Sequence, residues 1–166
     1  MYSVLIRRLL PADFSAVKAI YAAAINDKFQ TADLEMPDEN RWQQWWEMHT
    51  SDQFPVLVAV ADSCVVGWLS ISPYRAGRRA LSGTVELSYY VHKDHRRSGV
   101  GTALMQNAIN EAKSLNYRKA IGIILSRNQS SRLFLEKAGF SLWGILPEVA
   151  CMDGEYCNHE YWGVTL

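Results

Sequence analysis

ELSYYVHKDHRRSGVGTALMQNAINEA, residues 86–112, sets out a strand, a turn and a helix in that order. The strand is predicted over residues 84–91, which hold no breaker and are rich in residues that favour extended backbone. The helix is predicted because apolar residues recur near helical spacing at Val100, Ala103, Leu104, Ala108 and Ala112. A polar loop that ends in two glycines, Gly99 and Gly101, joins the strand to the helix.

A glycine-rich turn at this place is suited to binding phosphate. Glycine lets the main chain approach an anion because no β-carbon stands in the way. The free N–H groups of the first helical turn and the helix dipole then favour negative charge. Arg96 and Arg97 add two guanidinium groups that match phosphate oxygens. The alternative is an ordinary glycine loop with solvated arginines, because glycine is frequent in loops of every kind.

The spacing of the glycines excludes two nucleotide-binding signatures. The chain has no Gly-x-x-x-x-Gly-Lys-Ser/Thr run, and the third glycine of a dinucleotide fingerprint is replaced by Leu104. Arg96-x-x-Gly99-x-Gly101 instead resembles the Arg/Gln-x-x-Gly-x-Gly/Ala signature of the GNAT acyltransferases, whose turn holds the pyrophosphate of acetyl-CoA. The resemblance implies acetyl-CoA contacts along the whole turn: Arg96, Arg97, Ser98, Gly99, Val100, Gly101 and Thr102.

Length and composition narrow the class of protein. A chain of 166 residues suits one domain, residues 1–166. Acidic and basic residues balance at 17 each, so nucleic acid and anionic membranes are not expected partners. Three cysteines without metal-ligand spacing favour a reduced, cytoplasmic setting and no metal site. We expect neither a signal peptide, because Arg7 and Arg8 interrupt the first apolar residues, nor a membrane span.

The order of the predicted elements indicates a mixed α/β fold. Helices are predicted to begin at Pro11, near Pro37 and at Val100, with a short helix over residues 128–138 that ends at Gly139. Strands are predicted over residues 2–7, 54–61, 65–72, 84–91, 119–126, 140–143 and 159–164. This is the order expected of a GNAT domain, with a central, twisted, mostly antiparallel sheet flanked by helices.

Further motifs resemble the phosphinothricin acetyltransferase subfamily. Its Thr-Val-Glu-His-Ser-Val-Tyr-Val strand corresponds to residues 84–91, where Thr84, Val85, Glu86, Ser88, Tyr90 and Val91 match. Other matches are Arg78-x-Ala80, Asn128-x-x-Ser131, Glu136-Lys137-x-Gly139-Phe140, Leu146-Pro147-Glu148-Val149 and Asp153-Gly154. The resemblance implies an N-acetyltransferase that moves acetyl from acetyl-CoA to the primary amine of a small molecule. The acceptor would be an amino acid or an analogue of the phosphinothricin or methionine sulfoximine type, and the enzyme a homodimer.

Alternation along the strand predicts where the chemistry lies. Glu86, Ser88 and Tyr90 share one face, and a polar face in the middle of a sheet suggests a functional cleft. The resemblance implies that Glu86 is the general base, acting through a water molecule. The alternative is a structural ion pair of Glu86 with Arg75 or Arg78. A backbone N–H near Tyr90, freed by a bulge, would stabilise the oxyanion by about 3 kcal/mol.

The resemblance assigns the remaining site residues. Main-chain groups of Tyr89, Tyr90 and Val91 would bind the pantetheine arm, and so would Asn128 and Ser131, although Asn128 also suits a helix cap. Arg75 and Arg78 would hold the acceptor carboxylate; a solvated basic loop is the alternative. No cysteine lies on the strand to form an acyl-enzyme, so the amine would attack directly. Trp42, Trp45, Trp46 and His49 form an apolar helix face that serves either the core or the wall of an acceptor pocket.

Three positions depart from the family pattern. Leu135 stands where many members carry Tyr or His and cannot protonate the departing thiolate. The subfamily's aromatic residue near Thr31 is absent, with Asp33 close by, and Leu81 replaces a common Tyr. These departures leave two alternatives open: a different amine, such as a peptide N-terminus or an antibiotic, and an acetyl-CoA-binding sensor without turnover.

Overall fold

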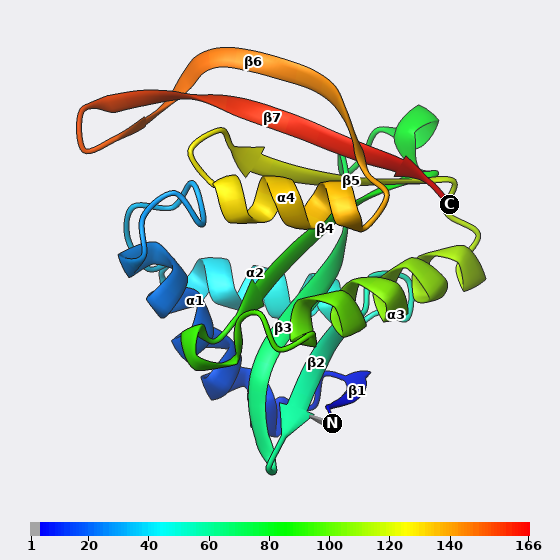
Figure 1. Ribbon diagram of the computed structural model, residues 1–166. Coiled ribbons are helices and arrows are strands. Elements are labelled where there is room, and N and C mark those ends of the chain that lie inside the picture. The colour runs from blue at the N-terminus through cyan, green and yellow to red at the C-terminus, as the bar shows by residue number, and fades with distance from the viewer. Residues whose placement is uncertain (1–3) are drawn as a thin grey trace.

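The computed structural model describes residues 4–166 and places seven strands in one twisted sheet (Figure 1). The strand order is β1-β2-β3-β4-β5-β7-β6, and every neighbouring pair is antiparallel except β4 with β5. The mixed, mostly antiparallel fold predicted from the sequence is therefore confirmed. The elements are β1 (Leu5–Arg8), α1 (Phe14–Asn26), α2 (Glu39–His49), β2 (Val56–Ala61), β3 (Cys64–Pro73), β4 (Thr84–Val91), α3 (Val100–Ser114), β5 (Lys119–Leu125), α4 (Gln129–Lys137), β6 (Ser141–Met152) and β7 (Glu155–Thr165).

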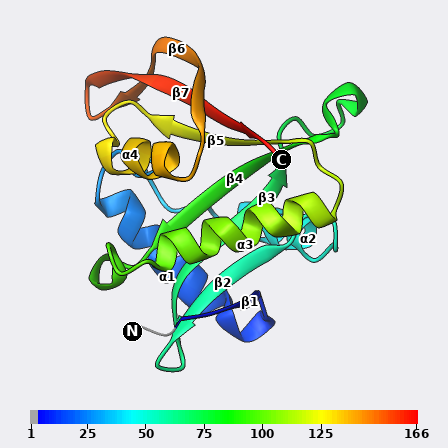
Figure 2. The same ribbon diagram turned by 45° about the vertical axis from the view of Figure 1, so that its right-hand side comes forward.

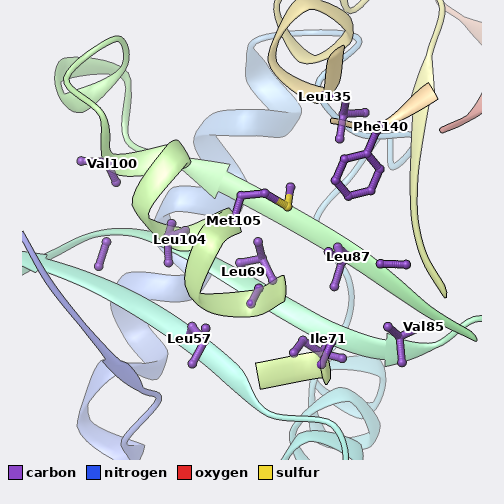
Figure 3. Packing of buried hydrophobic residues seen from close by; sticks show 14 of the residues in the cluster. Leu57, Leu69, Ile71, Val85, Leu87, Val100, Leu104, Met105, Leu135 and Phe140 are labelled. Atoms are coloured by element: carbon purple, nitrogen blue, oxygen red, sulfur yellow. The ribbon is translucent and has the colours of Figure 1, made fainter. Parts of the chain in front are cut away.

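The helices cover both faces of the sheet. α3 and α4 lie on one face, and α1 and α2 lie on the other (Figures 1 and 2). α3 follows the predicted apolar stripe, and Leu104 and Met105 are fully buried against β2, β3 and β4 (Figure 3). Val85 and Leu87 of β4 point into this core, as their alternation predicts. The opposite face of β4 is thereby left for Glu86, Ser88 and Tyr90.

The C-terminal hairpin differs most from the sequence-based expectation. Two short strands over residues 140–143 and 159–164 were predicted, but β6 has 12 residues and β7 has 11. The prediction missed the middle of β6 because Pro147 has no N–H to donate and Glu148 has a φ of +51°, which interrupt the strand pattern. The β6–β7 register shifts between Leu146 and Ala150 to accommodate them. The turn at Asp153-Gly154, which the sequence indicated, is confirmed.

The N-terminal elements agree with expectation in place and differ in detail. The strand predicted over residues 2–7 is β1, Leu5–Arg8, and positions 2 and 3 lie outside the described residues. The helix predicted from Pro11 begins as a short 3-10 turn before α1. Arg7 Nη1 donates to Asp13 Oδ2 at 2.6 Å, which fastens this turn to β1. Among residues 4–166, every helix is too short or too polar to span a lipid bilayer.

One pairing in the sheet shapes the site. β4 and β5 are parallel neighbours over only three registered pairs, from Thr84 opposite Lys119 to Glu86 opposite Ile121. Beyond Glu86 the two strands diverge (Figure 2). β4 therefore passes through the middle of the sheet with one edge unpaired along its second half.

Candidate functional site

A pocket of about 330 Å³ lies over the polar face of β4. We call it the aromatic pocket, because its walls carry five aromatic rings: Tyr21, Trp42, Trp45, Trp68 and Tyr90. Glu86 and Ser88 line it from β4, and Arg41 lines it from α2. Trp42 is almost fully buried and packs with α1 and β3, so the apolar face of α2 serves both the core and the pocket.

Glu86 is half-buried beside these rings. Burial raises the pKa of the Glu86 carboxyl, and the positive charge of Arg75 acts in the opposite direction. Among the described residues, no cation lies within 4.0 Å of the carboxylate, so the ion pair considered as an alternative role for Glu86 does not form here. A partly desolvated carboxylate with a raised pKa is suited to accept a proton near neutral pH.

The basic loop before β4 lies outside the pocket lining. Arg75 and Arg78 are exposed, and the Arg75 guanidinium stands 5.0 Å from the centre of the Tyr74 ring. Neither arginine lines the aromatic pocket, although Arg75 is near enough to affect the pKa of Glu86. The cation that does line the pocket is Arg41, which the sequence analysis did not single out.

Arg41 belongs to a hydrogen-bonded group at the pocket wall. Its Nη1 donates to Asp33 Oδ1 at 2.9 Å, and the Tyr21 hydroxyl donates to Asp33 Oδ2 at 2.5 Å. The hydroxyl of Thr31 lies 2.8 Å from that of Tyr21 and accepts from the Asp33 N–H at 3.2 Å. Both carboxylate oxygens of Asp33 are therefore occupied. Burial raises the pKa of the Tyr21 phenol, so it stays a donor.

A second and larger pocket, about 970 Å³, is lined by Tyr89, Tyr90 and Val91 near the end of β4. We call it the turn pocket, because the glycine-rich turn forms one wall through Arg96, Arg97, Gly99, Gly101 and Thr102. α4 forms the opposite wall through Ser131 and Phe134, and β4 runs between the walls. Tyr90 lines both pockets, so the two spaces meet at this residue.

The turn has the backbone that its glycines predict. Gly99 caps α3 with a φ of +91°, a region that side chains disfavour. The first helical bond closes from the Ala103 N–H to Gly99 O, so the amides of residues 100–102 have no partner within α3. The rest of the predicted phosphate site is also here, since Ser98 precedes Gly99 and Val100 begins the helix.

The two arginines of the turn differ in their surroundings. Arg96 donates to Asp27 at 2.5 Å and through Nε to Val91 O at 3.3 Å, which ties the turn to the end of α1 and to β4. Arg97 is exposed, lines the turn pocket and makes no ion pair among residues 4–166. The positive charge available to a ligand is therefore that of Arg97, together with Lys93 and Lys137, which also line the turn pocket.

The unpaired edge of β4 carries free main-chain groups. The His92 N–H donates to Val66 O on β3, and Val91 O accepts from Arg96 on the other side. Because these groups alternate along a strand, the amides of Tyr89 and Val91 point away from β3. β5 does not reach them, so they face the turn pocket region without a partner strand. The β3–β4 register is continuous, so the bulge predicted near Tyr90 is wrong, and divergence of β5 frees these amides instead.

α4 begins at a buried cap. Asn128 is 4% exposed, and its Oδ1 accepts from the Ser131 N–H at 3.0 Å, so the capping role considered for Asn128 is confirmed. Its Nδ2 donates to Gln30 Oε1 at 3.5 Å, which links the cap to the loop after α1. Ser131 lines the turn pocket, whereas Asn128 lies behind it.

Leu135 faces the core rather than either pocket. It is fully buried among residues of α3 and β4 (Figure 3). Tyr89 carries a phenol like that of the Tyr found in many family members at the position of Leu135. Its hydroxyl is buried without a hydrogen bond among the described residues. Burial raises the pKa of Tyr89. We find no proton donor on α4 at the position of Leu135.

Sequence reasoning did not assign Tyr21, Arg41 or Trp68, which line the aromatic pocket, to an acceptor site. Tyr21 lies in the buried stripe of α1. Trp68 is buried on β3 directly opposite Tyr90 of β4, with ring centres 4.7 Å apart. Knowledge of this β3–β4 register would have placed Trp68 beside Tyr90, but the pairing of two strands cannot be predicted from a single sequence.

Comparison with known proteins supplies a family. Residues 17–140 match the family model described as "Acetyltransferase (GNAT) family". YwnH of Bacillus subtilis (strain 168), which is provisionally named a phosphinothricin acetyltransferase, is 35% identical over 93% of this chain and 94% of its own. The L-amino acid N-acyltransferase MnaT of Escherichia coli (strain K12) is 30% identical over 97% and 93%.

Solved structures share the fold throughout. The structure of yncA from Salmonella typhimurium with its cofactor acetyl-CoA aligns with a TM-score of 0.90 and 26% identity. The alignment covers 98% of this chain and 94% of that one.

Proposed function

The chain belongs to the acetyltransferase (GNAT) family and is an acetyl-CoA-dependent N-acetyltransferase; from this premise we propose that its acceptor is the primary amine of an amino acid or a close analogue. The observation that carries the proposal is the position of Glu86. It is a half-buried carboxylate on β4 without an ion pair among the described residues, in a pocket of small-ligand size that meets the turn pocket at Tyr90.

The turn pocket is our proposed site for acetyl-CoA. The amides of residues 100–102, the αL backbone at Gly99 and the side chain of Arg97 suit its pyrophosphate. The unpaired amides of Tyr89 and Val91 suit the amide groups of its pantetheine arm, and Ser131 lies on the facing wall. Arg96 would support this arrangement indirectly, because its ion pair with Asp27 fixes the turn.

In the proposed reaction, Glu86 accepts a proton from the acceptor ammonium through a water molecule. The nitrogen lone pair then forms a bond to the thioester carbonyl carbon, and an amide N–H of Tyr89 or Val91 stabilises the oxyanion by about 3 kcal/mol. Collapse breaks the carbon–sulfur bond. The nitrogen loses its second proton to water, and because Leu135 cannot donate, we propose that the CoA thiolate leaves as such and is protonated through this water.

Arg75 and Arg78 are our proposed ligands for the acceptor carboxylate. Both are exposed on the loop that precedes β4, and the charge of Arg75 already acts on Glu86. We expect Arg78→Glu to raise the acceptor KM while the dissociation constant of acetyl-CoA stays the same. If neither quantity changes, the assignment of Arg78 is wrong.

The finer features of the protein are also proposals. We propose a homodimer, which is supported by the exposed apolar side chains that gather on β6 and β7, among them Trp143, Ile145 and Val149. A cytoplasmic location is supported by the unpaired state of Cys64, Cys151 and Cys157. Residues 1–166 are proposed to form one domain. Light scattering of the purified protein tests the homodimer, which a monomeric mass would exclude.

The main experiment measures CoA release from acetyl-CoA with a panel of amines, alongside calorimetry of acetyl-CoA binding. We expect micromolar to millimolar KM values for small amino acids or their analogues and loss of turnover in Glu86→Gln. A peptide N-terminus is the alternative acceptor, which the small volume of the aromatic pocket disfavours. Turnover that is unaffected in Glu86→Gln would overturn the assignment of the base.

A further inference from the structure

The aromatic pocket offers an acceptor side chain five rings, with Ser70, Ser72 and Ser88 as neutral polar groups between them. Trp45 lies 5.7 Å from both Trp42 and Trp68, measured between ring centres, and Trp68 lies 4.7 Å from Tyr90. These rings enclose the space above Glu86, and Met48 closes it from α2. Such a lining favours apolar or polarisable groups by burial and by contact with ring faces.

The one basic side chain that lines the pocket already has an acidic partner. Arg41 is the one basic residue among the described residues that line it, and its guanidinium is held by Asp33. Asp33 is fixed in turn by the Tyr21 hydroxyl, and its side chain is only 19% exposed. The Glu86 carboxylate has no ion-pair partner. An anionic group entering the pocket would therefore meet one unpaired acid and a cation that is already neutralised.

We infer that Asp33, by holding Arg41, makes this enzyme selective for acceptors with an uncharged side chain and disfavours acceptors with a second anionic group. The inference rests on the proposed function and narrows its acceptor class. Asp33 is a positioning residue here, because it acts through Arg41. The carboxylate of an amino acid acceptor would lie outside the pocket, toward Arg75 and Arg78, so only the side chain is selected.

A comparison of two acceptors of nearly the same shape tests the effect of side-chain charge without a change in size. L-Phosphinothricin carries a methylphosphinate anion, and L-methionine sulfone carries an uncharged methylsulfone at the same place. We expect kcat/KM for the sulfone to exceed that for phosphinothricin by about tenfold or more, because like charges in a partly buried site repel. Equal values, or a preference for phosphinothricin, would overturn the inference.

The substitution Asp33→Asn tests the residue itself. Asparagine keeps an oxygen that can accept from Tyr21 but removes the charge that neutralises Arg41. We expect the ratio of the two kcat/KM values to fall by about threefold or more, because a half-exposed ion pair contributes little and its loss is modest. Glu35→Gln is the matched control: it removes a charge from the same loop at an exposed position, and the ratio should not change.

Acceptor binding is measured separately, by quenching of tryptophan fluorescence in the presence of CoA. Three of the chain's six tryptophans line the pocket, so a bound acceptor changes the signal. If no amine is acetylated but the sulfone still binds more tightly than phosphinothricin, the proposed function fails and the selectivity stands. If both are acetylated and the ratio is the same in Asp33→Asn with unchanged circular dichroism, Asp33 is not the determinant.

Discussion

Leu135 packs so closely on Gly122 that a β-carbon built on this glycine would lie 3.1 Å from Leu135 Cδ2. Leu135 is also fully buried in the α3 core (Figure 3). We therefore expect Leu135→Tyr, which restores a residue common in the family, to destabilise the fold by about 1–3 kcal/mol through overpacking. Urea denaturation measures this change, and kcat should not increase.

Leu133 provides the control for that substitution. It lies two residues earlier on α4 and is 57% exposed, so Leu133→Tyr should change the free energy of unfolding by less than about 0.5 kcal/mol. A stable Leu135→Tyr with faster turnover would show that α4 can shift and present a phenol to the thiolate.

The pH dependence of turnover should report Glu86. Because burial raises the pKa of Glu86, the base is protonated at a higher pH than an ordinary glutamate, whose pKa is about 4.3. We expect kcat/KM to fall on the acidic side through an ionisation above that value. Glu86→Gln should lower kcat by about 10²–10⁴-fold and remove this limb from the residual activity.

The same carboxyl affects stability with the opposite sign. A carboxyl with a raised native pKa binds its proton more tightly in the folded state, so its contribution to stability is present below the unfolded pKa and is lost as pH rises through the native pKa. Glutamine carries no such charge. We expect Glu86→Gln to be more stable than the wild type at pH 7, with the difference smaller at pH 4, by thermal unfolding at both values.

Arg97 should contribute to coenzyme affinity through its charge. It lines the turn pocket without an ion pair, so its guanidinium is available to phosphate. We expect Arg97→Gln to raise the dissociation constant of acetyl-CoA about tenfold at low salt, and less at high salt because of screening. Arg118→Gln, at an exposed position outside both pockets, is the control. Equal affinity of Arg97→Gln and wild type would remove Arg97 from the site.

Local patterns in the sequence predicted the elements around β4 because each has a strong signal of its own. The strand over residues 84–91 and the helix cap at Gly99 lie where the alternation and the glycines place them. Asn128 caps α4 for the same reason. The polar face of β4 also indicated a cleft, because polar groups buried in the middle of a sheet cost free energy unless they are paired.

Features that depend on tertiary contacts were not predictable in this way. The ion pair between Asp33, on a loop, and Arg41, on α2, joins residues eight positions apart in the sequence, and neither residue belongs to a motif. The freeing of the β4 amides depends on how far β5 follows β4, which is a tertiary pairing that no local pattern encodes. For this reason the sequence suggested a bulge where the structure has a divergence.

The turn pocket and the aromatic pocket would bind their ligands through different kinds of group, and this difference matters for protein engineering. On the proposed assignment, the coenzyme is held mainly by backbone atoms, which every amino acid shares, while the acceptor meets side chains such as Trp45 and Trp68. A library confined to the aromatic pocket can then diversify the choice of amine without eroding affinity for the acyl donor. A change of acyl donor would be harder to engineer, because the backbone of the sheet itself would have to be remodelled.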